Sequence, residues 1–103
     1  MSQATPGTRF RDALQKETPL QIVGAINAYA AMLAERTGFH AIYLSGAGVA
    51  NASFGLPDLG VTSLNDVLEE VRRITGATNL PLLVDCDTGW GGAFSIARTV
   101  REM

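Results

Sequence analysis

The sequence is poor in cysteine and in charge. Cys86 is the only cysteine among 103 residues, which excludes an intrachain disulfide framework and favours a reducing cytoplasm. Charged residues make up 17% of the chain and the net charge is −2. Because basic side chains do not gather on any one segment, we expect neither nucleic acid nor an anionic membrane surface as a partner.

Long apolar runs are absent as well. No run approaches the ~20 residues that a membrane-spanning helix needs. Residues 1–7 lack the basic segment and the apolar stretch of a secretory signal. We therefore expect a protein that neither crosses a membrane nor is secreted.

What the sequence does contain is enough apolar material for one core. Hydrophobic residues make up 47% of the chain, and residues 1–103 are predicted to form a single domain. Strand and helix patterns alternate, which is typical of an α/β fold with a parallel sheet and right-handed crossovers. The expected elements are a helix over 8–16 with Thr8 as N-cap, strands over 20–26, 41–44 and 82–84, and helices over 28–37, from 64 to about 76, and from 93 onward.

All four predicted helices show an apolar face, which in the first consists of Phe10, Ala13 and Leu14. The clearest follows a capping-box pattern at Ser63 and Asp66, and its apolar residues recur at the spacing of one helical face. The residues expected on these faces are Leu64, Val67, Leu68, Val71 and Ile74 in the third helix, Ala30, Leu33 and Ala34 in the second, and Ala93, Ile96, Ala97 and Val100 in the last.

Two carboxylates follow the third strand. Asp85 and Asp87 come directly after the apolar run 82–84, and side chains two residues apart in an extended segment point the same way. Paired carboxylates at the carboxyl end of a strand suit Mg²⁺, which one or two carboxylates hold together with water and substrate oxygens. A solvated acidic loop, in which either residue caps the next helix, is the alternative.

The second strand ends in a glycine-rich segment, 45–48, read S-G-A-G. Its hydroxyl and backbone N–H groups can approach an anion closely, although a plain tight turn also requires glycine. A dinucleotide-binding fingerprint is disfavoured, because Asn51 occupies the third glycine position and a loop with a proline is expected to follow in place of a helix. Tyr43 stands two residues before Ser45, so both side chains should share one face.

A long loop to Val61 is expected to follow. Loops of this length inside a compact domain tend to carry function, and Asp58 could either cap a turn or support a metal site. His40, before the second strand, is predicted to be structural. Cys86 is predicted to point away from the two carboxylates as a buried thiol.

Four segments carry a family resemblance: P-L-Q-I-V-G-A-I-N, A-I-Y-L-S-G, G-L-P-D-L-G and L-L-V-D-C-D-T-G-W-G. In this order and spacing they resemble the amino-terminal part of the 2-methylisocitrate lyases, members of the isocitrate lyase/phosphoenolpyruvate mutase superfamily. The resemblance implies a (β/α)8 TIM-type barrel, of which this chain would hold an amino-terminal helix and the first three strand–helix units. It also implies Mg²⁺ and cleavage of 2-methylisocitrate to pyruvate and succinate.

The resemblance also implies roles for individual residues. Asp85 and Asp87 would hold Mg²⁺, and Asp58 would support that shell. The substrate would be contacted by Tyr43, Ser45, Gly46 and Ala47, the last replacing the family's usual glycine. The family's catalytic cysteine belongs to a Lys-[Lys/Arg]-Cys-Gly-His motif beyond Met103, so no catalytic residue is expected within this chain.

Alternatives remain open at this point. Isocitrate lyase, oxaloacetate decarboxylase and phosphonopyruvate-processing enzymes share the same motifs. Since the last helix pattern is still running at Met103, the chain is expected to be an incomplete barrel that is inactive alone, or a truncated chain that serves only in assembly. As a full-length protein it is expected to be a homotetramer acting on a small tricarboxylate.

Overall fold

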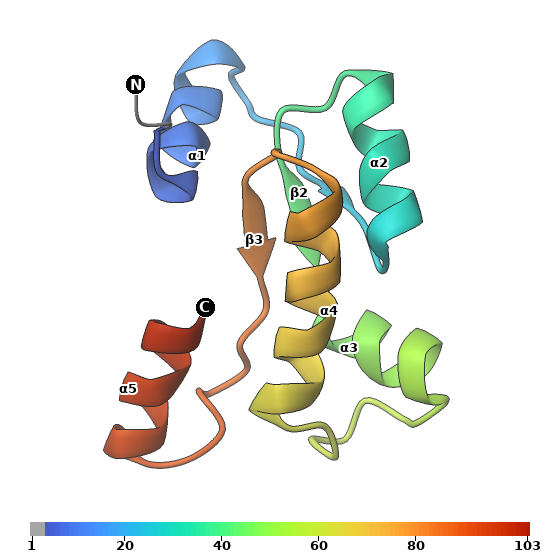
Figure 1. Cartoon of the computed structure of the whole chain (residues 1–103), viewed down its shortest axis with the longest axis vertical. Coiled ribbons are helices and arrows are strands. Elements are labelled where there is room, and N and C mark those ends of the chain that lie inside the picture. Colours follow the sequence, from blue (N-terminus) through green and yellow to red (C-terminus); the bar gives the residue numbers. More distant parts are fainter. Residues whose placement is uncertain (1–3) are drawn as a thin grey trace.

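The computed structural model describes residues 4–103 as alternating helices and strands (Figure 1). The alternation confirms the predicted α/β class. None of the helices within these residues is both long enough and apolar enough to cross a membrane. The elements are α1 (Pro6–Lys16), β1 (Val23–Gly24), α2 (Ala28–Thr37), β2 (Ile42–Leu44), α3 (Gly46–Gly48), the π-helix η1 (Val49–Ser53), α4 (Leu64–Ala77), β3 (Leu82–Val84) and α5 (Ala93–Glu102).

The three strands form one parallel sheet in the order β1-β2-β3, as predicted. Val23 pairs with Ile42, and Ile42 pairs with Leu82. Strand β1 is shorter than the predicted 20–26, although the N–H of Ala25 still donates to the carbonyl of Tyr43 at 2.9 Å. Because the strands are parallel, their carboxyl ends meet at one edge of the sheet.

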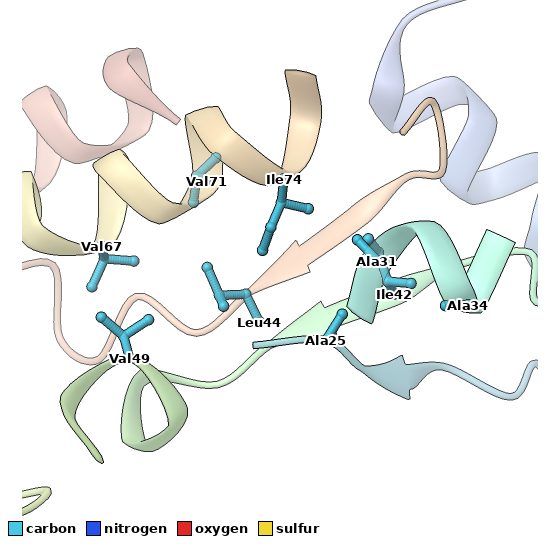
Figure 2. Packing of buried hydrophobic residues seen from close by; sticks show 9 residues of the cluster. All are labelled: Ala25, Ala31, Ala34, Ile42, Leu44, Val49, Val67, Val71 and Ile74. Atoms are coloured by element: carbon cyan, nitrogen blue, oxygen red, sulfur yellow. The ribbon is translucent and has the colours of Figure 1, made fainter. Parts of the chain in front are cut away.

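The core lies between the sheet and the helices that cover one of its faces. Ile42 and Leu44 point from β2 toward α2 and α4, where they are fully buried (Figure 2). Leu83 belongs to the other face and is 43% exposed, so the two faces differ in how they are covered. The core cluster consists of Ala25, Ala31, Ala34, Ile42, Leu44, Val49, Val67, Val71 and Ile74.

Helix α4 forms as the sequence predicts. The five residues of its predicted apolar face are all buried. Its start is a full capping box, since Ser63 Oγ accepts from the Asp66 N–H and Asp66 Oδ2 accepts from the Ser63 N–H at 2.8 Å. These two bonds satisfy backbone donors that the first turn of a helix leaves free.

Two predictions about the first two helices are wrong. Helix α1 begins at Pro6, and Thr5, not Thr8, is its N-cap, because proline at the first helical position needs no backbone donor. In α2 the buried residues are Ala31 and Ala34, whereas Leu33 is exposed. The small alanines let α2 approach the sheet closely.

The segment after β2 also differs from the prediction of one long loop. It continues as α3 and η1, helical up to Ser53. Val49 and Ala50 are buried, and their burial against the core favours a helical turn where the composition alone indicated a loop. The irregular connection that remains covers residues 55–63.

Candidate functional site

Asp85 joins the ends of two neighbouring strands. Its N–H donates to the carbonyl of Leu44 at 3.0 Å, so the pairing of β2 and β3 extends to this residue. Its Oδ2 accepts from the N–H of Gly46 at 3.3 Å, and its Oδ1 accepts from the N–H of Asp87 at 3.0 Å. Backbone donors on both sides therefore fix the direction of the carboxylate.

Asp87 turns toward the same point as Asp85. A Cβ placed on Gly46 would lie 3.1 Å from Asp85 Oδ2 and 3.7 Å from Asp87 Oδ1. The two carboxylates therefore converge as predicted, but not because the strand continues. Asp87 has a φ of 46°, so a left-handed turn, not a continued strand, brings its carboxylate beside Gly46.

The turn that carries Asp87 is fastened to α5. Gly89, with a φ of 92°, donates its N–H to the carbonyl of Cys86 at 2.8 Å. The carbonyl of Gly89 accepts from Thr99 Oγ1 at 2.9 Å, and Thr99 is the buried residue of α5. Sequence reasoning missed Thr99. Thr99 stands three residues after Ile96, so its hydroxyl lies beside the apolar face of the helix. This position is the feature of the sequence that could have identified it.

Cys86 lies between the two carboxylates in the sequence and is partly buried. Burial, and then the negative charges of Asp85 and Asp87, raise the pKa of its thiol above the usual value of 9.0. A raised pKa lowers the fraction of the nucleophilic thiolate. The thiol is only partly buried, and not fully buried as predicted.

The end of β2 forms a compact cap next to Asp85. Ser45 Oγ accepts from the N–H of Gly48 at 3.2 Å, which starts the turn of α3. A Cβ on Gly48 would lie 2.8 Å from Ile26 Cγ2, so the close packing of this turn requires glycine there. Tyr43, on β2, is partly buried, and Ala47 is the central residue of α3.

Two other residues discussed from the sequence lie outside the carboxyl ends of β2 and β3. Asp58 is an exposed residue of the connection 55–63, and within residues 4–103 no side-chain hydrogen bond joins it to Asp85 or Asp87. His40 is at the amino end of β2, where its Nε2 lies 3.8 Å from Glu17 Oε2. Its position fits the structural role that was predicted.

The donor set fits a hard divalent cation that also takes ligands from elsewhere. In the part of the chain that the structure describes, no cluster of three or more His, Cys, Asp or Glu side chains could hold a metal ion. Asp85 and Asp87 provide two carboxylates and no soft ligand. This combination suits Mg²⁺, which usually keeps several waters and accepts only one or two protein carboxylates.

The comparison with known families identifies relatives along nearly the whole chain. The family model for phosphoenolpyruvate phosphomutase matches residues 10–103. A protein of Shewanella oneidensis named 2-methylisocitrate lyase is 72% identical over 96 residues, which cover 93% of this chain and 33% of that protein. The chain thus spans about a third of the length of this curated relative.

Solved structures similar to this chain belong to the same superfamily. A 2,3-dimethylmalate lyase of the phosphoenolpyruvate mutase/isocitrate lyase superfamily has a TM-score of 0.81 and 33% identity, over 98% of this chain and 36% of that one. A phosphonopyruvate hydrolase solved with oxalate and Mg²⁺ has a TM-score of 0.77 and 32% identity, over 96% and 35%. With its three parallel strand–helix units in the order of a TIM barrel, the chain belongs to the phosphoenolpyruvate phosphomutase family.

Proposed function

We propose that this chain is the amino-terminal part of a Mg²⁺-dependent lyase that cleaves 2-methylisocitrate to pyruvate and succinate. The observation that carries the proposal is the pair Asp85 and Asp87, whose carboxylates converge beside Gly46 at the carboxyl edge of the sheet. Ligands of such folds gather at this edge. The 72% identity to a protein named 2-methylisocitrate lyase supports this substrate among those of the superfamily.

Asp85 and Asp87 would hold the metal ion. The N–H groups of Gly46 and Asp87 orient the Asp85 carboxylate before any ion binds, so little rearrangement is needed on binding. When bound, Mg²⁺ supplies positive charge next to the oxygens on which negative charge grows as the carbon–carbon bond breaks. We propose that Asp58 supports the water shell of this ion from the connection 55–63.

The other proposed substrate contacts come from β2 and the turn that follows it. Ser45 and Ala47 belong to the cap beside Asp85. The N–H of Gly46 donates to Asp85 at the carboxyl edge of the sheet, which forms the rim of the site. Tyr43 lies two residues before Ser45 and shares its face of the strand. Together these residues would bind and orient the pyruvate-forming end of a tricarboxylate.

Two alternatives of different kinds follow from the same geometry. Other members of the superfamily act on other carboxylates, and the carboxylate pair by itself does not distinguish their substrates. A chain that only takes part in assembly is favoured by exposed apolar side chains, such as Phe94 at 93% and Val100 at 72% exposure. Such side chains are also expected where further strands and helices of a barrel would pack.

We further propose that the natural-length protein is a cytoplasmic homotetramer. Relatives of this kind are about three times as long as this chain, because 33% of the Shewanella oneidensis protein is covered. Light scattering of the natural-length protein measures its oligomeric state, and a monomer would contradict this proposal. Residues 1–103 alone are expected to release no pyruvate.

The test is a lyase assay on the natural-length protein. Pyruvate release from 2-methylisocitrate should require Mg²⁺, and Asp85→Asn should lower kcat/KM by about 10³-fold. Asp12→Asn is the matched control, since Asp12 is an exposed residue of α1 and its substitution should leave the rate unchanged. Faster turnover of isocitrate, oxaloacetate or phosphonopyruvate would select another member of the superfamily, and no turnover of any of these would favour the assembly role.

A further inference from the structure

A buried carboxylate interrupts the apolar face of α4. Glu70 is 5% exposed, whereas the other buried residues of this helix are apolar. Removing a carboxylate from water is costly, so such a group persists in a core only when it is paired and hydrogen-bonded. An alanine or leucine would cover the same surface without this cost. The presence of a carboxylate here therefore calls for a specific partner.

That partner is the end of η1. Glu70 Oε2 accepts from Ser53 Oγ at 3.3 Å and lies 3.3 Å from Arg73 Nη1. Arg73 belongs to the same helix, one turn further along, and its side chain is 56% exposed. Ser53 is also exposed, but it is the last residue of η1. The Ser53–Glu70 contact consequently ties α4 to a different segment of the chain.

The segment between these contacts is the one that builds the rim. It begins with Gly46, which donates to Asp85, and it ends with Ser53, which donates to Glu70. Figure 1 shows α3 and the turn after it beside the lower end of α4, between β2 and the connection 55–63. Its second half is a π-helix, a rare conformation that is frequent at functional sites.

We infer that Glu70 is a positioning residue, which acts through Ser53 to hold residues 46–53 in place so that the Gly46 N–H stays on Asp85. The contact is part-buried, at the edge of the core, and a polar contact of this kind fixes one arrangement of the packed elements where apolar packing alone would accept several. The consequence for catalysis rests on the function proposed above. The contact and its effect on residues 46–53 do not.

The experiment compares variants of the natural-length protein. Ser53→Ala and Glu70→Ala remove the contact from either side, and Glu70→Gln retains an oxygen that can accept from Ser53. Glu69→Gln is the matched control, because Glu69 neighbours Glu70 and also pairs with Arg73, but its side chain is 59% exposed. Amide hydrogen exchange over residues 46–56 and the kinetic constants for 2-methylisocitrate are measured for each variant.

Ser53→Ala and Glu70→Ala should speed exchange over residues 46–56 by about tenfold, with the rest of the chain unchanged. In the same variants kcat/KM should fall by about tenfold, because the displaced segment contacts the substrate and its Gly46 N–H orients the carboxylate of Asp85. Glu70→Gln should restore most of both values. Glu69→Gln should resemble the unmodified protein.

Unchanged exchange over residues 46–56 in both alanine variants would overturn the inference, and so would faster exchange spread evenly over the whole chain. The first result would mean that the Ser53–Glu70 contact does not hold residues 46–53 in place. The second would mean that Glu70 contributes only to global stability. If the unmodified protein cleaves none of the substrates, the proposed function fails, but the exchange data still decide the role of Glu70. The two failures are therefore distinguishable.

Discussion

Helices α4 and α5 both carry apolar residues at helical spacing, but α4 buries them and α5 leaves them exposed. Ile74 of α4 is fully buried, whereas Ile96 and Val100 of α5 are 43% and 72% exposed. Their starts differ too. Ser63 and Asp66 form a capping box on α4, but α5 begins after Gly92 with no side-chain cap.

The difference comes from what lies opposite each helix. α4 packs against the sheet and α2, where its side chains complete the core (Figure 2). α5 lies beyond the carboxyl end of β3, below and to the left of it in Figure 1, and Thr99 fastens it to the turn at Gly89. Apolar periodicity thus predicts which face of a helix is apolar, while burial of that face depends on a partner that the periodicity does not specify.

The two halves of the candidate site are held in place by these two different regions. Gly46 starts a segment whose Val49 and Ala50 are buried in the core beside α4. Asp87 belongs to a turn that is held by Asp85 and, through Gly89, by Thr99 of α5. One half of the rim is therefore anchored in the core and the other half on a helix with an open face. The following substitutions test this contrast.

The largest effect is expected from shortening a core side chain of α4. Ile74→Ala should lower the free energy of unfolding by about 2–5 kcal/mol, because it leaves a cavity in a closely packed core. Val100→Ala in α5 should change it by less than about 0.5 kcal/mol, since the side chain is 72% exposed. Urea unfolding of residues 1–103 measures both. Equal losses would show that the two helix faces are covered alike.

A smaller loss is expected at the glycine that joins the rim to α5. Gly89→Ala should destabilise the chain by about 1–3 kcal/mol, because φ is 92° and a Cβ would lie 2.6 Å from Ile96 Cγ1. Gly76→Ala in α4 is the control. A Cβ there has nothing within 4 Å, so alanine should stabilise the helix by about 0.5–1 kcal/mol. Thermal unfolding that shifts in the same direction for both variants would contradict this difference.

A smaller difference in unfolding free energy is expected between a substitution at the N-cap of α4 and one inside α1. Ser63→Ala removes the side-chain acceptor of the Asp66 N–H and should cost about 1 kcal/mol in unfolding free energy. Thr8→Ala is a useful comparison, because Thr8 is a helical residue of α1 and not its cap. Calorimetry should show a loss for Ser63→Ala that Thr8→Ala does not match; similar losses would mean that the capping box adds little.

The smallest effect is expected from giving α5 the cap that it lacks. Gly92 has an extended backbone, with φ −78° and ψ −169°, and a Cβ there would meet open space. Gly92→Ser should therefore stabilise the chain by a few tenths of a kcal/mol. Gly92→Ala provides the Cβ without the hydroxyl, and a gain as large in this variant would show that capping is not the cause.

Much of the site was predictable because it depends on local order along the chain. Asp85 and Asp87 follow an apolar strand, and parallel strands bring their carboxyl ends to one edge of the sheet. The conformation of Asp87 was not predictable in the same way. The turn is held by the Asp87 N–H on Asp85 Oδ1 and by the Gly89 N–H on the Cys86 carbonyl. It is joined to α5 by the contact of Gly89 with Thr99, which an extended-strand pattern does not predict.

The sequence by itself determined the parallel α/β order, the apolar face and capping box of α4, and the place of the two carboxylates, because each depends on residue spacing within one element or on chain order. Only the tertiary structure decided that Ala31 and not Leu33 faces the core, that residues 49–53 form a π-helix, and that Glu70 meets Ser53. These features depend on how closely two elements approach each other, and no pattern within either element sets that distance.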